Sequence, residues 1–290
     1  MKPPPFRYHD PDSVEEAIGL LGRLENARLL AGGQSLMPML NMRFVLPDHL
    51  VDLARVEALR GVRLEADRAR IGAMTVQRDL ERDAALAERL PLVAEALRWV
   101  GHRQTRNRGT LGGSLCHLDP AAELPAVCAV LDAVVRVRGP GGERQLAFAD
   151  FPLGYMTPAI EPDEMLVGVE LPLWPRGHGH GFAEFARRHG DYAIALAAVQ
   201  LALDASGRIA RAAVAIGGVG PAPVRVQAAE RALLGEAPTD AVLAAAAAAC
   251  REVEAMDDVQ VPGTYRRQLA GVMARRALAD AVARASAQGT

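Results

Sequence analysis

Two glycine-rich stretches give the clearest indication of function in this sequence, because both are suited to binding an anion through backbone groups. The first runs from Ala31 to Leu36 and reads Ala-Gly-Gly-Gln-Ser-Leu. Glycine permits φ > 0 and lets a ligand approach the backbone closely, and successive exposed N–H groups form a concavity for phosphate oxygens. No Lys or Arg occurs between residues 31 and 42, so an anion held there depends on backbone dipoles. Taken alone, a Gly-Gly pair after a strand is more often a tight turn.

A second stretch, Thr110 to Leu115, repeats the order of a small residue, Gly-Gly, a polar residue and leucine. Two such loops are suited to holding a pyrophosphate from both sides. Ser35 and Ser114 would each donate a hydroxyl hydrogen bond to phosphate, or satisfy their own turns instead. Neither stretch contains G-x-G-x-x-G or a Gly-Lys-Ser/Thr sequence, which argues against a Rossmann or a Walker loop.

The paired stretches resemble the FAD-binding subunits of the molybdenum hydroxylase family, of the carbon monoxide dehydrogenase medium-subunit and xanthine dehydrogenase FAD-domain types. In that family an A-G-G-x-S-L loop and a T-[IL]-G-G-[NS]-L loop hold the FAD diphosphate, and Cys116 to Pro125 also match the tail of the second motif. The resemblance extends over nearly the whole chain. The FAD-binding residues that it implies in the two stretches are Ala31, Gly32, Gly33, Gln34, Ser35, Leu36, Thr110, Gly112, Gly113 and Ser114.

The same resemblance implies five further contacts with FAD. Glu123 stands where the xanthine dehydrogenase branch has an aspartate at the ribityl chain, and glutamate is one methylene longer. Asp119 either touches FAD or caps the following helix. Leu166 and Val167 would pass near the isoalloxazine ring, although a buried core strand explains the same apolar pattern. Tyr192 would shield the ring, or else pack between domains.

A basic run, His102 to Arg108, precedes the second stretch. We interpret it either as a solvated surface segment or as a group that neutralises the diphosphate or contacts a partner subunit, and no single arginine is assigned. His178 and His180 suggest a metal site only weakly, because no carboxylate or cysteine cluster accompanies them, and a linker is the favoured interpretation. No metal ligand and no catalytic residue is assigned. Flavin performs its own redox chemistry, which agrees with the lack of a Ser/His/Asp order, an HExxH motif or paired carboxylates.

Complete enzymes of this family also need two [2Fe–2S] clusters, with four cysteine ligands each, and a molybdopterin cofactor. Three scattered cysteines cannot supply the clusters. The resemblance therefore implies an electron-transfer subunit with a large molybdopterin-binding subunit and a small [2Fe–2S] subunit as partners, a heterotrimer whose dimerisation stays open. Two alternatives are a stand-alone flavin oxidoreductase, like the enolpyruvoyl-glucosamine reductases, and a non-catalytic nucleotide-binding assembly subunit. The substrate and the final electron acceptor are not readable from the sequence.

The elements that position these residues predict an α+β protein. The resemblance implies a two-part FAD-binding domain of the PCMH type over residues 1–175, with a small α/β unit (1–56) and a larger mixed-sheet α/β unit (57–175). Residues 176–290 would form a C-terminal domain of the carbon monoxide dehydrogenase flavoprotein type, a small antiparallel sheet with a helical bundle. Ser13 with Glu16, Thr75, and Pro238-Thr239-Asp240 read as helix starts. Pro120 is expected to open another helix.

The composition and charge limit the kinds of partner and the cellular location that we expect for this protein. The chain has 290 residues, half of them hydrophobic, and a net charge of −2, which gives no reason to expect nucleic acid or an anionic membrane as partner. The odd number of cysteines argues against a disulfide framework and fits a reducing cytoplasm. The first residues contain no apolar segment of a secretory signal, and the alanine run around 242–250 is too short to span a membrane.

Overall fold

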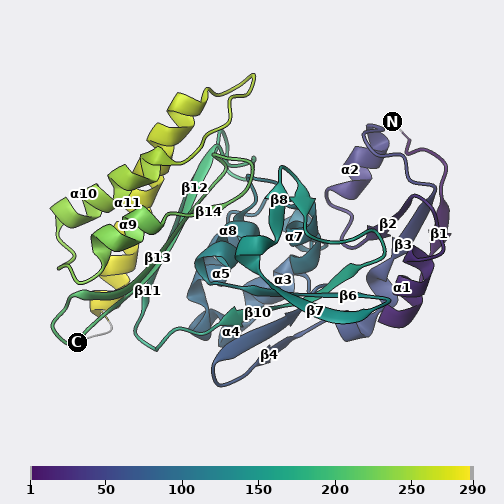
Figure 1. Cartoon of the computed structure of the whole chain (residues 1–290), viewed down its shortest axis with the longest axis horizontal. Helices are drawn as coiled ribbons and strands as arrows, with labels where there is room; N and C mark the ends of the chain where they lie inside the picture. Colours follow the sequence, from purple (N-terminus) through teal and green to yellow (C-terminus); the bar gives the residue numbers. More distant parts are fainter. Residues whose placement is uncertain (1, 288–290) are drawn as a thin grey trace.

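The structure is a computed structural model that describes residues 2–287; the outer limits of the predicted domains, Met1 and residue 290, lie outside the described residues. Three units follow one another along the long axis of the molecule (Figure 1). Each unit contains its own sheet, and the predicted α+β class is confirmed, although the sheet of the second unit is antiparallel throughout and not mixed as predicted. Among residues 2–287, no helix combines the length and apolar character that a membrane span requires.

The first unit is a three-stranded parallel sheet in the order β1-β3-β2. Its strands are β1 (Arg7–His9), β2 (Ala27–Leu30) and β3 (His49–Asp52), and its helices are α1 (Val14–Leu21) and α2 (Leu36–Asn41). Ser13 caps α1 as predicted, because its hydroxyl accepts a hydrogen bond from the Glu16 N–H at 3.1 Å. The apolar face of α1 packs against β3 and Met74, which closes a small core.

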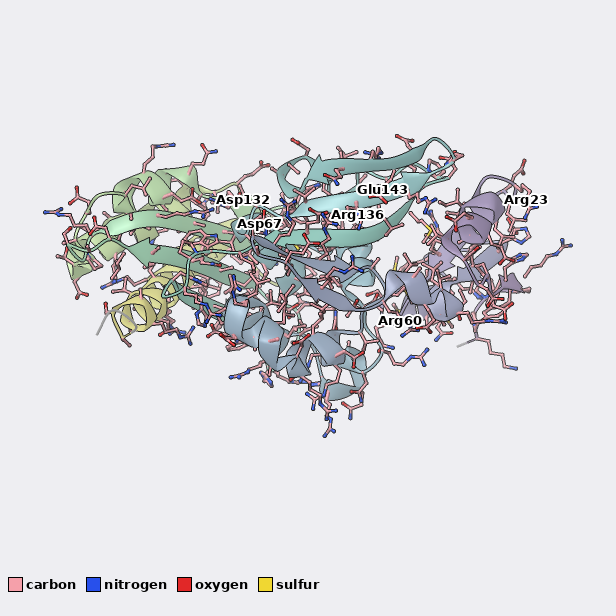
Figure 2. All side chains as sticks on the ribbon, turned by 90° about the horizontal axis from the view of Figure 1, so that it is seen from below. Arg23, Arg60, Asp67, Asp132, Arg136 and Glu143 are labelled. Atoms are coloured by element: carbon pink, nitrogen blue, oxygen red, sulfur yellow. The ribbon has the colours of Figure 1, made fainter. Side chains whose placement is uncertain are left out.

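The second unit is a five-stranded antiparallel sheet in the order β4-β5-β10-β6-β7. The strands are β4 (Val62–Leu64), β5 (Arg68–Gly72), β6 (Val134–Gly139), β7 (Gly142–Ala147) and β10 (Met165–Pro172), and the helices are α3 (Gln77–Arg82), α4 (Ala84–Arg89), α5 (Pro91–Leu97), α6 (Arg103–Arg106), α7 (Leu111–His117) and α8 (Glu123–Val130). One face of this sheet packs on the apolar core, and the opposite face carries ion pairs such as Arg136 with Glu143, at 2.7 Å (Figure 2). A two-stranded sheet, β8 (Pro152–Gly154) with β9 (Thr157–Pro158), follows β7.

The third unit is a four-stranded antiparallel sheet in the order β11-β12-β13-β14, covered on one face by helices. The elements are β11 (Gly179–Phe185), β12 (Ala195–Leu203), β13 (Ile209–Gly217), β14 (Val224–Arg225), α9 (Gln227–Leu233), α10 (Asp240–Ala249) and α11 (Gly263–Ala287). Thr239 caps α10 as predicted. Gly179 and Gly181 let α11 approach β11 closely, because a Cβ on either glycine would lie about 2 Å from a carbonyl oxygen of α11.

The second and third units share one apolar core. Phe182 and Leu196 of the C-terminal sheet belong to the same buried cluster as helix α8, and every residue of α8 is buried. The Glu95 carboxylate binds Arg284 at 2.6 Å across the same seam. The predicted boundary at residues 175/176 falls between β10 and β11, and the domain limits themselves stay a prediction.

Three local predictions are wrong. Thr75 does not cap a helix: its hydroxyl donates to the Gly61 carbonyl, and α3 begins at Gln77 after Val76. Pro120 does not open α8, which begins at Glu123. The segment His178–His180 is not a linker, because His178 is buried and β11 already starts at Gly179.

Candidate functional site

The first glycine stretch forms a loop between β2 and α2 whose donors are unused. Gly33 has a φ of 72°, in the left-handed region that favours glycine. Within residues 2–287, the backbone N–H groups of residues 32–35 donate to no protein acceptor. The Ser35 hydroxyl likewise forms no cap on α2. Four consecutive free donors in a loop that itself contains no lysine or arginine fit an anion bound by backbone groups.

Gly32 holds this loop against the segment that precedes the second stretch. A Cβ at Gly32 would lie 2.1 Å from the Arg108 carbonyl oxygen and 2.9 Å from the Gly109 Cα. Both neighbours are backbone atoms, so no side-chain rotation relieves the clash. A Cβ at Gly113 would lie 3.5 Å from the Ala31 Cβ, so the two stretches are neighbours in space. The structure therefore brings together the two motifs that the sequence paired.

The second stretch is not a loop, contrary to the prediction, but the first turn of α7. Thr110 is the N-cap, and its hydroxyl accepts from the Gly113 N–H at 3.0 Å. The N–H groups of Leu111 and Gly112 donate to the carbonyls of Thr75 and Ala73, and that of Ser114 donates to Thr110. All four N–H groups at this helix start are therefore already hydrogen-bonded within the protein. The Ser114 hydroxyl remains without a protein partner in the described part of the chain, and the run of four consecutive unused N–H groups belongs to the first loop, not to the start of α7.

Acidic and aromatic residues gather beyond the other end of α7. Seven helical residues place the two ends about 10 Å apart. Asp119 accepts from the Ala121 N–H at 2.9 Å and does not cap α8, whose N-cap is Ala122. Glu123, 8% exposed, has its pKa raised to about 7, chiefly by burial and also by Asp119. Tyr192 is 69% exposed, yet local burial of its hydroxyl, with Asp119 and Glu123 nearby, raises its pKa.

Glu184 on β11 belongs to the same cluster, although the sequence did not predict it as a site residue. Its side chain is buried, and its Oε2 has no hydrogen-bond partner among the described residues. Burial and the Glu123 carboxylate raise the pKa of Glu184 to about 9. The two glutamates come from different units, so this carboxyl pair forms only when the C-terminal sheet meets α8. A single acid in an apolar strand gives no sequence signal of this meeting.

Leu166 and Val167 lie on β10 at an irregularity in its pairing with β6. The Leu166 side chain is 3% exposed and belongs to the main core, as the buried-strand interpretation expected. Val167 is partly buried against the core of the first unit. Its carbonyl accepts from the Ala73 N–H at 3.1 Å, and Ala73 in turn accepts from Gly112. The backbone of Ala73 thus ties β10 to the start of α7.

The basic run divides into structural and exposed arginines. Arg106 is mostly buried, binds Glu81 at 3.0 Å and donates to the Val100 carbonyl, so it holds α6 against α3. Arg103 and Arg108 are exposed, and neither forms an ion pair with any described residue.

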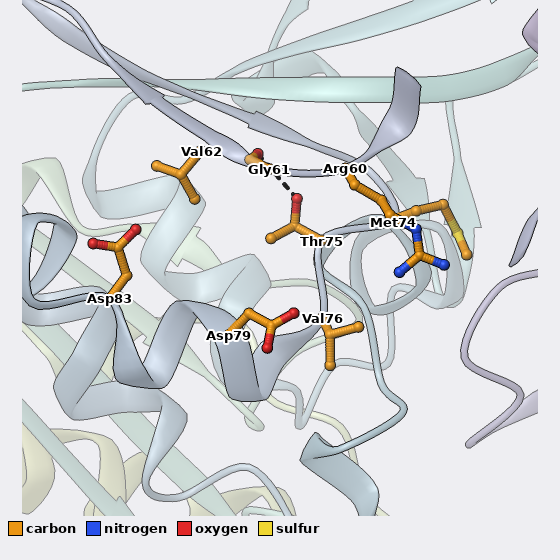
Figure 3. A pocket seen from close by; sticks show the side chains of 8 residues that line it. All are labelled: Arg60, Gly61, Val62, Met74, Thr75, Val76, Asp79 and Asp83. Atoms are coloured by element: carbon orange, nitrogen blue, oxygen red, sulfur yellow. Dashed lines mark hydrogen bonds between the residues drawn. The ribbon is translucent and has the colours of Figure 1, made fainter. Parts of the chain in front are cut away.

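Other features of the described chain add no competing site. A pocket beside β4 and α3 is lined by none of the predicted site residues (Figure 3). Its lining residues are Arg60, Gly61, Val62, Met74, Thr75, Val76, Asp79 and Asp83. No group of three or more His, Cys, Asp or Glu within residues 2–287 is arranged to hold a metal ion. The three cysteines are free thiols.

Comparison with known proteins matches the chain to two family profiles. Residues 4–174 match the FAD binding domain in molybdopterin dehydrogenase, and residues 180–281 match the CO dehydrogenase flavoprotein C-terminal domain. The chain is 42% identical to the 6-hydroxypseudooxynicotine dehydrogenase complex subunit alpha of Paenarthrobacter nicotinovorans, over 98% of this chain and 97% of that one.

Two solved structures have nearly the same fold. A chain of carbon monoxide dehydrogenase from Hydrogenophaga pseudoflava superposes with a TM-score of 0.95 at 40% identity, covering 98% of this chain and 99% of that one. A chain of quinoline 2-oxidoreductase from Pseudomonas putida 86 gives 0.93 at 36% identity, covering 98% and 99%.

Proposed function

This chain belongs to the family of FAD-binding subunits of molybdopterin dehydrogenases, and from that membership we propose that it carries electrons from [2Fe–2S] clusters of a partner subunit through FAD to an external acceptor. FAD is the cofactor of the family, and its members are subunits of oxidoreductases. The proposed partners are a large molybdopterin-binding subunit and a small [2Fe–2S] subunit. The three free thiols agree with a reducing cytoplasm as the proposed location.

The observation that supports the proposal is the set of unused N–H donors at residues 32–35. A diphosphate needs several donors at once, and this loop offers them without a cation. Bound FAD supplies the redox chemistry itself. The residues of the chain would hold the diphosphate, orient the ring and exclude water.

We assign these tasks to the residues that the sequence pointed out. The diphosphate contacts are proposed for Ala31, Gly32, Gly33, Gln34, Ser35, Leu36, Thr110, Gly112, Gly113 and Ser114, and the ribityl and ring contacts for Asp119, Glu123, Leu166, Val167 and Tyr192. Because the N–H groups of Gly112 and Gly113 are already hydrogen-bonded, these two glycines would touch the diphosphate through close packing, whereas the Thr110 hydroxyl, which accepts from Gly113, still has a proton to donate. Ser35 and Ser114 retain free hydroxyls for phosphate.

The decisive experiment is the visible absorption spectrum of the purified chain before and after addition of FAD and desalting. Flavin bands that stay with the protein are expected. The chain should then be co-expressed with the neighbouring iron–sulfur and molybdopterin subunits, and reduction of the flavin by added substrate should be measured. Protein that stays colourless even with its partners would contradict the proposal and favour a non-catalytic assembly role. Flavin reduced without any partner would favour the stand-alone oxidoreductase.

Tyr192→Ala is expected to leave FAD bound but to expose the ring, because this side chain lies 69% exposed beside Asp119 and Glu123. Flavin fluorescence and the rate of reoxidation should both rise. Tyr265→Ala, which removes a 40% exposed tyrosine of α11, is the matched control and should change neither. An unchanged flavin spectrum and reoxidation rate in Tyr192→Ala would reduce Tyr192 to a packing residue.

A further inference from the structure

An exposed cationic surface adjoins the proposed flavin site. We name it the junction surface and define it by Arg103, Arg108, Arg187, Arg188 and Tyr192. All five residues are exposed. Arg103 and Arg108 come from the basic run of the second unit, and the other three come from the loop between β11 and β12 of the third unit.

The two segments are in contact. A Cβ on Gly190 would lie 2.6 Å from the His102 ring and 3.1 Å from the Gly101 carbonyl oxygen. The rings of Trp99 and His189 pack edge to face with centroids 5.8 Å apart. The two segments that carry these arginines are therefore neighbours in space, although about eighty residues separate them in the sequence.

The charge of this surface is not neutralised. Within residues 2–287, none of its four arginines forms an ion pair, whereas nearby Arg106 is paired with Glu81. Asp191 is the only acidic residue in segments 98–108 and 187–192, which contain six arginines including the paired Arg106, and Asp119 lies beside Tyr192 at the border of the surface. A concentrated positive field of this kind attracts and orients negatively charged partners.

The surface also has direct access to the site. The Arg108 carbonyl touches the first glycine loop at Gly32, and Tyr192 lies in the same loop as Arg187 and Arg188. Tyr155, 58% exposed, acts electrostatically on Tyr192 and so lies near it. Exposed aromatic residues bordered by arginines have the composition of a protein–protein contact. Small-molecule sites are instead concave and mostly apolar, whereas these arginines are exposed.

We propose that the junction surface is the docking face for an acidic electron-carrier protein that serves as the external acceptor. This inference depends on the proposed electron-transfer function. Each of two carrier molecules would take up one electron from the reduced site, and two protons would pass to solvent. The guanidinium groups would pair with carboxylates of the carrier while Tyr192 forms the apolar centre of the contact.

The test uses the full-length chain and two well-behaved carriers of opposite charge, acidic plastocyanin and basic cytochrome c. Binding is measured by titration at low and high salt, first without and then with FAD. Plastocyanin should bind at low salt and dissociate at high salt, and cytochrome c should not bind. The double variant Arg187→Glu/Arg188→Glu should lose at least about tenfold in affinity for plastocyanin, with FAD content unchanged. The control Arg267→Glu/Arg276→Glu reverses two exposed, unpaired arginines of α11 and should bind like the wild type.

Three results would overturn the proposal. One is equal plastocyanin binding by the two double variants. Another is loss of FAD in Arg187→Glu/Arg188→Glu, which would assign the arginines to the cofactor. The third is loss of plastocyanin binding once the small iron–sulfur subunit is co-expressed, which would assign the surface to that subunit. Because binding is also measured without FAD, a chain that never retains flavin would contradict the proposed function through the spectrum alone.

Discussion

Gly33→Val is expected to abolish FAD retention. Gly33 has a φ of 72°, where a β-branched side chain is strained by about 1–3 kcal/mol, and a Cβ there would lie 3.2 Å from the Met37 Cγ. The loop must leave its present path to relieve both effects. That movement disperses the donors of residues 32–35, so several hydrogen bonds to the diphosphate are lost together. A loss of about 3 kcal/mol corresponds to more than a hundredfold in affinity.

The measurement is the ratio of flavin to protein after desalting, together with the thermal midpoint. Gly19→Ala is the matched control, because Gly19 lies within α1 and a Cβ there meets nothing within 4 Å. It should bind FAD like the wild type, with a small gain in stability from the helix propensity of alanine. A folded Gly33→Val protein with normal flavin content would remove this loop as the binding site.

Glu184→Gln is expected to stabilise the protein at alkaline pH and to have little effect at acidic pH. Burial and Glu123 raise the pKa of Glu184 from 4.5 to about 9 in the folded state. Between these values the folded protein holds a proton that the unfolded chain releases. The free energy of unfolding therefore falls as pH rises through this window, and glutamine removes that dependence. The difference between the two proteins should grow by roughly 5 kcal/mol from about pH 5 to about pH 9.

Urea unfolding of both proteins across this range gives the comparison. Glu88→Gln is the control, because Glu88 is exposed and, among residues 2–287, pairs only with Arg176, so its pH profile should follow the wild type. Glu123→Gln should show the same trend over a narrower window that ends near pH 7, where the raised pKa of Glu123 lies. Parallel pH profiles for wild type and Glu184→Gln would show that the Glu184 carboxyl is solvated in the folded protein.

Local signals in the sequence predicted the elements that depend on neighbouring residues alone. The caps at Ser13 and Thr239 are present because a short hydroxyl side chain reaches the N–H three residues ahead, whatever lies around it. The order of such elements was enough to predict the α+β class.

Features set by distant contacts escaped prediction. The two glycine stretches look alike in sequence, yet the second becomes a helix start because the carbonyls of Ala73 and Thr75 take up its N–H groups. Thr75 has the side chain of a cap, but the Gly61 carbonyl captures its hydroxyl. Glu184 and Glu123 meet only through the docking of β11 on α8. No pattern within either segment contains that information.

The interface between the second and third units also constrains how segments of related chains can be exchanged. Glu95 on α5 and Arg284 on α11 form an ion pair across it, and Trp99 and Phe182 pack ring to ring at 6.5 Å. A hybrid gene that joins the front half of one relative to the back half of another therefore inherits only one member of each pair. Hybrids joined between β10 and β11 would fold stably only when both parent proteins have compatible residues at these positions. The residues on the two sides of the contact are therefore expected to vary together among relatives.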